Sequence, residues 1–177
     1  MIAKVDEFAP RMLVIGIDPG TASTGYGVVR QTQDRGLEAV DFGIIATTPD
    51  DPMPQRLKRL FLELRALLEK HQPESGAVEQ LFFQRNVKTA ITVGQARGVV
   101  LLALAEAGIS IAEYTPLEIK QAVIGYGGAD KRQIQDMVKA LLGMAERPQP
   151  DDAADALAVA ICHLHSSATI RRMEEMS

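Results

Sequence analysis

Four carboxylates stand where a metal-dependent reaction could use them. Asp18 ends one short apolar segment, Glu79 ends another, and Asp152 and Asp155 open a helical segment. If the first two segments are parallel neighbouring strands, Asp18 and Glu79 lie side by side at the carboxyl edge of the sheet, where open α/β sheets keep their sites. Asp152 and Asp155 are three residues apart and therefore share one helix face.

Carboxylates that converge in one cleft repel each other unless a cation neutralises them. Hard oxygen ligands without a nearby cysteine or histidine favour Mg²⁺, with Mn²⁺ as its substitute, over zinc. Two such ions about 4 Å apart would clamp the attacking and leaving oxygens of a phosphodiester. The single cysteine, Cys162, excludes a disulfide framework and a multi-cysteine zinc site.

Each carboxylate also has a purely structural interpretation. Asp18 before Pro19-Gly20 is typical of a turn, Asp152 of a helix cap, and Asp155 of a first turn that favours the helix dipole. Asp151 competes with Asp152 both for the cap and for the cleft, so the register of the metal ligands stays open. Glu79 is the hardest to explain structurally, because it interrupts a buried strand.

Hydrophobic periodicity predicts the elements that position these residues. Strands are expected at 13–17, 26–31, 37–45, 76–80 and 109–114, and helices at 57–68, 87–107, from Pro116, at 130–142 and at 152–166. A capping box, Thr115-Pro116-Leu117-Glu118, marks the third helix start. Three meander strands followed by α/β crossovers predict an α/β fold with a mixed five-stranded sheet and helices on both faces. We expect a tail at 1–11, one domain at 12–166, and a frayed end at 167–177.

Composition favours a globular protein of the reducing cytoplasm. The chain has 177 residues, 46% of them apolar, and a net charge of −4. Asp6 and Glu7 stand where a secretory signal would be basic and then apolar. The longest apolar run, Val99 to Ala105, is far below the ~18 residues of a membrane span.

The net acidic charge argues mildly against nucleic acid as a partner. Its distribution matters more, because Arg85, Lys88 and Arg97 lie in a stretch, 80–105, without any acidic residue. Phe82 and Phe83 follow Glu79 closely, so an aromatic pair lies at the lip of the expected cleft. Such a ring can stack on an unpaired base, worth ~1–3 kcal/mol.

Several separated motifs, taken together, resemble the RuvC family of bacterial Holliday-junction resolvases. They are Gly16-Ile17-Asp18-Pro19-Gly20, Gly25-Tyr26-Gly27, Val78-Glu79-Gln80, Gly94-Gln95-Ala96-Arg97-Gly98, Lys120-Gln121 and Asp152-Ala153-Ala154-Asp155-Ala156-Leu157-Ala158. The resemblance runs from Met12 to about His165. Residues 1–11 have no counterpart in it.

The resemblance implies an RNase H-like fold, a homodimer, and Mg²⁺-dependent paired nicking of four-way junctions in recombination and repair. It implies that Asp18, Glu79, Asp152 and Asp155 bind the metal. Lys120 and Lys131 match the family's phosphate-binding lysines, and Phe82 matches its junction-probing aromatic. Arg85 and Lys88 beside Phe82 would contact phosphates, and RuvA and RuvB are the expected protein partners.

Two other functions fit parts of the sequence. Asp18-Pro19-Gly20-Thr21 also looks like the first phosphate loop of the sugar kinase and actin ATPases, but 177 residues are too few for their two domains and no second loop of that kind follows. A junction-binding module with an inactive metal site is the other alternative, against which stand all four carboxylates.

Overall fold

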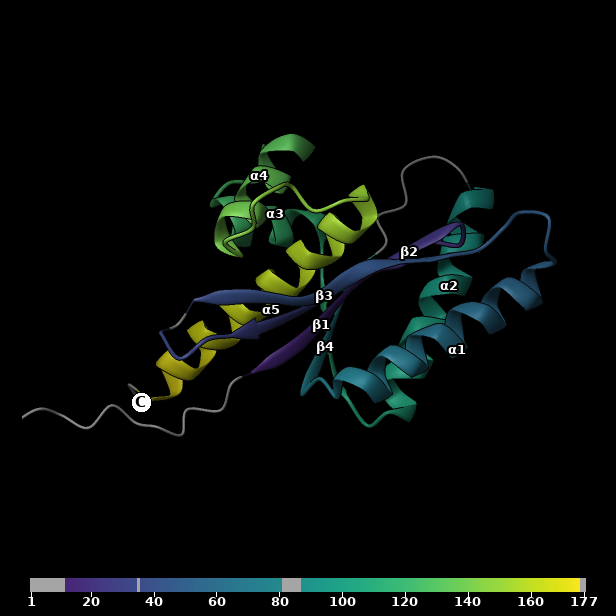
Figure 1. Ribbon diagram of the computed structural model, residues 1–177, viewed down its shortest axis with the longest axis horizontal. Helices are drawn as coiled ribbons and strands as arrows, with labels where there is room; N and C mark the ends of the chain where they lie inside the picture. Colours follow the sequence, from purple (N-terminus) through teal and green to yellow (C-terminus); the bar gives the residue numbers. More distant parts are fainter. Residues whose placement is uncertain (1–11, 35, 81–86, 176–177) are drawn as a thin grey trace, which may run out of the picture.

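A five-stranded sheet forms the centre of the molecule in the computed structural model, which describes residues 12–34, 36–80 and 87–175 (Figure 1). Its strands are β1 (Leu13–Asp18), β2 (Ser23–Gln31), β3 (Leu37–Ala46), β4 (Ser75–Glu79) and β5 (Ser110–Tyr114). They lie in the order β3-β2-β1-β4-β5. β1, β2 and β3 pair antiparallel, whereas β4 runs parallel to both β1 and β5. The predicted mixed sheet, with its meander and its crossovers, is confirmed.

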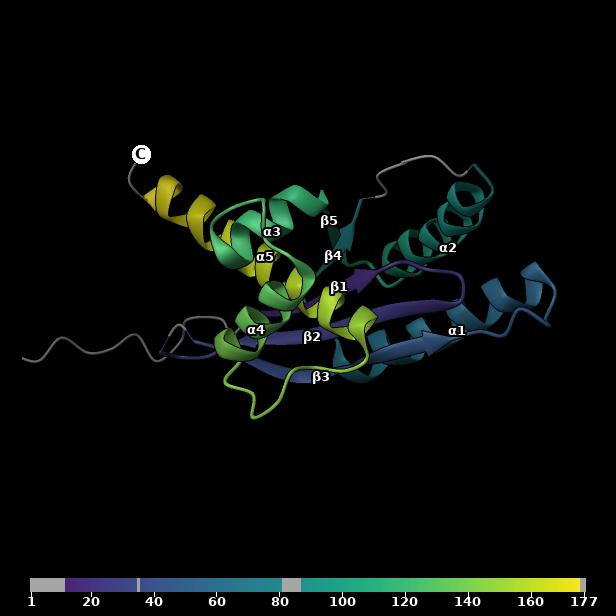
Figure 2. The ribbon, with the colours of Figure 1, turned by 90° about the horizontal axis from the view of Figure 1, so that it is seen from above.

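Helices cover both faces of this sheet, as expected (Figures 1 and 2). They are α1 (Met53–His71), α2 (Val87–Glu106), α3 (Pro116–Ile124), α4 (Lys131–Leu141) and α5 (Asp151–Glu175). One face carries α1 and α2, and the other carries α5 with α3 and α4 beside it. The sheet therefore separates two apolar cores.

The alternation of side chains along the strands decides which core each residue joins. Ile15, Ile17 and Val78 pack with α1 and α2, whereas Val14 and Ala77 pack with α5. Successive side chains of a strand point to opposite faces. The residues that follow Ile17 and Val78, the two strand-end acids, therefore face α5.

Helix α5 approaches the sheet more closely than side chains would allow. A Cβ atom added at Gly16 would lie 2.3 Å from the carbonyl oxygen of Ala156, and one at Gly25 would lie 1.9 Å from that of Asp152. At Gly27 it would lie 2.8 Å from the Leu157 side chain. The glycines of β1 and β2 let the helix backbone rest directly on the strands.

The helix ends follow their local chemistry. Thr115 and Glu118 form the expected capping box, and Asp130 and Gln133 form a second one at the start of α4. The sequence predicts that the last helix ends near Ser166. The structure shows that α5 continues to Glu175. The added residues include Ala168, Arg171 and Met173, which favour helix, and no glycine or proline interrupts them.

Helix α2 bears on the expectation that the chain has no membrane span. By length and composition alone its segment Thr89–Glu106 could cross a membrane, although its longest uninterrupted apolar run is short. One such helix is weak evidence, because core helices of globular proteins pass the same test. Only 22% of this segment is buried within one chain, and the side chains of Ile91 and Leu102 are more than half exposed. Several apolar side chains of α2 are thus exposed to solvent in a single chain, where burial in a core does not account for them.

Candidate active site

Strands β1 and β4 bring the first two predicted site residues together. Ile17 pairs with Val78 in the parallel register, so that Asp18 and Glu79 end neighbouring strands at the carboxyl edge. The Glu79 carboxyl lies close enough to that of Asp18 to raise its pKa. The turn that follows Asp18 is held by Thr24, whose hydroxyl donates to the Gly20 carbonyl at 2.6 Å.

Helix α5 supplies the other two carboxylates. One carboxylate oxygen each from Asp18, Asp152 and Asp155 lies within 4.8 Å of the others, a spacing at which one metal ion could bind all three. Gly25, opposite Asp18 in the β1–β2 register, allows the backbone of Asp152 to come this close. The four predicted acids therefore converge on one edge of the sheet.

The environment of these acids opposes their negative charge. Burial, reinforced by the neighbouring Glu79, raises the pKa of Asp18 to about 8. Burial also raises the pKa of Glu79, and that of Asp155 in spite of the opposing charge of Lys131. A cation bound among these oxygens would remove this penalty. Since the donors are all carboxylates, they fit Mg²⁺ or Mn²⁺.

A pocket of ≈ 250 Å³ opens beside the carboxylates and contains both predicted phosphate-binding lysines. Its lining includes Glu79 and Asp155, together with Lys120 of α3 and Lys131 of α4. The Lys131 ammonium lies 3.1 Å from Asp155. Positive charge is thus placed within reach of any phosphate that enters the pocket.

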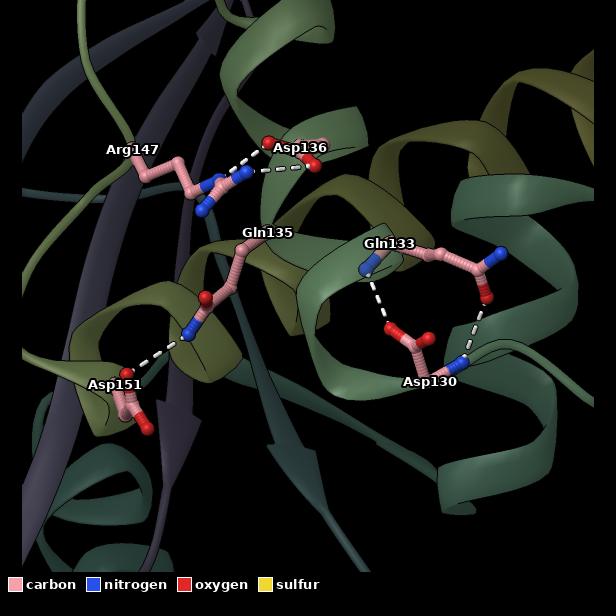
Figure 3. A network of polar contacts seen from close by, with 6 residues as sticks. All are labelled: Asp130, Gln133, Gln135, Asp136, Arg147 and Asp151. Carbon is pink, nitrogen blue, oxygen red and sulfur yellow. Dashed lines mark hydrogen bonds and ion pairs between the residues drawn. The ribbon is translucent and has the colours of Figure 1, made fainter.

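Asp151 lies apart from the carboxylate cluster and faces α4. One of its oxygens accepts a hydrogen bond of 2.9 Å from the Gln135 amide (Figure 3), and the other lies 3.2 Å from Lys131. Gln135 and Lys131 together lower the pKa of the Asp151 carboxyl. The sequence left open whether Asp151 or Asp152 joins Asp155 as a metal ligand. The geometry favours Asp152.

The remaining predicted site residues lie in or next to the segment of the chain between β4 and α2. Phe82 and Arg85 lie outside the described residues, and Lys88 is placed only as part of the α2 backbone. Arg97, from the same basic stretch, pairs with Glu113 of β5. Its charge is therefore partly neutralised within the chain.

Comparison with known proteins bears on this site directly. A family model described as crossover junction endodeoxyribonuclease RuvC matches residues 14–163, which include all four acids and both lysines. The chain belongs to the RuvC family. Two curated relatives of that name support this: one from Chloroflexus aggregans is 58% identical over 162 residues (91% of this chain, 98% of the relative), and one from Desulfitobacterium hafniense is 57% identical over 162 residues (92% and 98%).

A solved structure confirms the RNase H-like fold. It is titled as RuvC of T. thermophilus in complex with Holliday junction substrate, and it matches with a TM-score of 0.82 at 35% identity, covering 89% of this chain and 96% of that one. Membership in the RuvC family favours the nuclease over the ATPase that the Asp18-Pro19-Gly20-Thr21 loop also suggests.

Three contributors to the site were missed from the sequence. Thr24 holds the turn after Asp18, Gly25 seats the start of α5, and Gln135 holds Asp151. Gly25 lies in a motif already noticed, but its role depends on a helix more than 120 residues later in the chain. Nothing in the spacing of Gln135 and Asp151 indicates their contact.

Proposed function

We propose that this protein is an endonuclease that resolves four-way DNA junctions by paired symmetric nicks, leaving 5′-phosphate and 3′-hydroxyl ends. The observation that carries the proposal is the convergence of Asp18, Asp152 and Asp155, with Glu79 at the end of the strand beside Asp18, in a chain of the RuvC family. These four residues would be its catalytic carboxylates.

The cofactor is Mg²⁺, replaceable by Mn²⁺, with two ions in each site. When bound, the ions supply an activated water and neutralise charge on the phosphodiester. The chain's own residues do the rest: the acids hold the ions, and the Lys120 and Lys131 ammonium groups orient the phosphate in the pocket. Phe82, Arg85 and Lys88 would contact the junction close to these acids.

Two active sites at a fixed separation are needed for symmetric cuts. We therefore propose a homodimer in which the exposed apolar side of α2 packs against the same helix of a second copy. RuvA and RuvB are the proposed partners by family resemblance, and the cytoplasm is the proposed compartment. An apolar helix that pairs with its copy accounts for the composition of α2 without a membrane.

The test is cleavage of a labelled four-way junction and of a matched duplex, each with Mg²⁺ or with EDTA. We expect paired nicks on the junction alone, lost with EDTA and reduced by at least ~10³-fold in Asp18→Asn, since metal-site electrostatics are usually the largest catalytic contribution. Glu69→Gln is the matched control, because this exposed acid of α1 forms a surface ion pair with Arg65.

The outcomes separate the three functions considered. Binding of junctions of varied sequence without any nick, at any Mg²⁺ or Mn²⁺ concentration, would favour the binding module. Equal cutting of duplex and junction would contradict structure selectivity. A melting temperature raised by ATP, without junction binding, would revive the ATPase.

A further inference from the structure

Lys131 has two carboxylate partners that differ in what else they do. Its ammonium lies 3.1 Å from Asp155 and 3.2 Å from Asp151. Asp155 also belongs to the carboxylate cluster that would hold the metal. Asp151 is not one of the acids in that cluster. One of its oxygens accepts from Gln135 (Figure 3), and the other contacts Lys131. Metal binding would therefore affect the Lys131–Asp155 ion pair directly, but not the Lys131–Asp151 ion pair.

A divalent cation on Asp155 would weaken the ion pair between Asp155 and Lys131. The carboxylate charge would then be shared with the metal, and the ammonium would be repelled by a like charge a few ångströms away. Lysine is a flexible chain with a compact, strongly hydrated charge, so an ammonium released in this way turns toward solvent. The side chain of Lys131 is already half exposed. Asp151 is the partner that would remain.

The contact with Gln135 makes Asp151 a fixed anchor. Gln135 lies four residues after Lys131, one turn further along α4, and is buried. Its amide donates to Asp151 across the gap between α4 and α5 (Figure 3). Because this donor is buried and belongs to the helix opposite, its hydrogen bond restrains the partly exposed Asp151 carboxylate beside α4.

We propose that Asp151 is a positioning residue for Lys131: held by Gln135, it retains the Lys131 ammonium at the wall of the pocket when Asp155 binds a divalent cation. The ammonium then faces the phosphate and is not lost to solvent. The proposal rests on the proposed function, because it assigns the phosphate of the cleaved DNA to this pocket. It gives Asp151 a role that none of the four cluster acids has.

Two substitutions separate the parts of this arrangement. Asp151→Asn removes the charge that attracts Lys131 but keeps an oxygen that can accept from Gln135. Gln135→Met keeps the approximate volume of the buried side chain and removes the donor. Asp136→Asn is the matched control, because Asp136 is another acid of α4 whose partner is Arg147, away from Lys131 (Figure 3).

The first measurement is made on Lys131 itself, without DNA. Lysine side-chain ammonium signals are recorded by NMR during a Mg²⁺ titration, and Lys131→Gln identifies the signal. We expect the Lys131 signal to stay distinct from those of solvated lysines in the wild type and in Asp136→Asn. In Asp151→Asn, and less completely in Gln135→Met, it should merge with them as Mg²⁺ is added. A signal that behaves alike in Asp151→Asn and wild type overturns the proposal.

The second measurement is single-turnover cleavage of a junction. Asp151→Asn should cleave about tenfold more slowly, as expected for a displaced positioning group, with unchanged junction affinity and unchanged dependence on Mg²⁺ concentration. If Asp151→Asn instead raises the Mg²⁺ concentration needed for half-maximal rate, Asp151 is a metal ligand and the proposal is wrong. Failure of the wild type to cleave any junction would overturn the proposed function, while the NMR result would still report whether Asp151 holds Lys131.

Discussion

At Asp18, burial and a neighbouring carboxyl group act in the same direction. Both hold the proton on this side chain and raise its pKa to about 8 from the ordinary value of 3.8. In the unfolded chain Asp18 ionises near the ordinary value. Between these two pKa values the folded, metal-free protein therefore binds a proton that the unfolded chain has lost.

The stability of the metal-free protein should follow from this difference. The contribution of Asp18 is fully present below pH 3.8 and is lost as the pH rises through about 8. We expect the melting temperature in EDTA to fall across this window more steeply in the wild type than in Asp18→Asn. Mg²⁺ should restore the wild type most at the alkaline end. Parallel pH curves for the two proteins in EDTA would contradict this account.

Phe82 carries a prediction that comes from the sequence alone. If its ring separates bases at the junction, Phe82→Ala should slow cleavage of a four-way junction more than it weakens binding of the same junction. The loss of one stacking contact is worth ~1–3 kcal/mol. Cleavage rates and dissociation constants for the same labelled junction decide it. Equal losses in both would mean that the ring contributes to binding only.

Among the contacts between secondary-structure elements, the packing of α5 against β2 is the one on which the site depends most. At Gly25 the strand has no side chain, and the carbonyl of Asp152 occupies the space where a Cβ atom would lie. The obstacle is backbone and not the end of a flexible side chain. Any larger residue must therefore push the start of α5, and with it Asp152 and Asp155, away from Asp18.

Gly25→Ala should reduce cleavage more than it reduces stability. Overpacking of this kind costs ~1–3 kcal/mol, and displacement of the metal ligands adds a loss of activity of about a hundredfold. Melting curves and cleavage rates, measured where both proteins are folded, test this. Gly128→Ala is the control, because an added Cβ there meets only Tyr126 at ordinary contact distance. A variant that is destabilised but cleaves normally would show that α5 can shift without harm.

How far the sequence predicts each element depends on how local its causes are. The strand-end positions of Asp18 and Glu79 and the capping box at Thr115 follow from short patterns, and the structure has them as expected. The continuation of α5 to Glu175 was missed because polar residues were taken for a frayed end. The contact of Gln135 with Asp151 was missed because it depends on how α4 packs against α5.

At the scale of the whole molecule, α2 is the feature that one chain leaves unexplained. Its apolar side chains, Ile91 and Leu102 among them, are exposed although helices of this composition are normally covered. A second copy of the chain would cover them. In the proposed dimer, the apolar side of α2 holds two copies of the chain together. Because each copy carries one active site, this apolar side is needed for two cuts at one junction.

Leu102→Glu should dissociate the protein into monomers, because it introduces charge into the apolar side of α2. Sedimentation at micromolar concentration should show a dimer for the wild type and a monomer for this variant. Nicks on the two strands should then become uncoupled. Leu62→Glu, at a similarly exposed leucine of α1, is the matched control. A wild type that sediments as a monomer would contradict the dimer.

The sheet divides the interior into two cores, and the two cores differ in how they contact the site. The core shared with α5 includes Leu157 and Ala160, which lie against Gly27 and Gly16 of the strands. A change of volume there should therefore shift α5 and the acids at its start.

The core under α1 and α2 adjoins the same edge at Ile17 and Val78, which directly precede Asp18 and Glu79. Leu64 of α1 and Val100 of α2 lie in this core, on the face of the sheet opposite α5. Exchanges of matched volume at these positions should therefore alter stability more than cleavage. Substitutions in the two cores should thus separate heat resistance from cleavage, with the larger effect on cleavage coming from the face that carries α5.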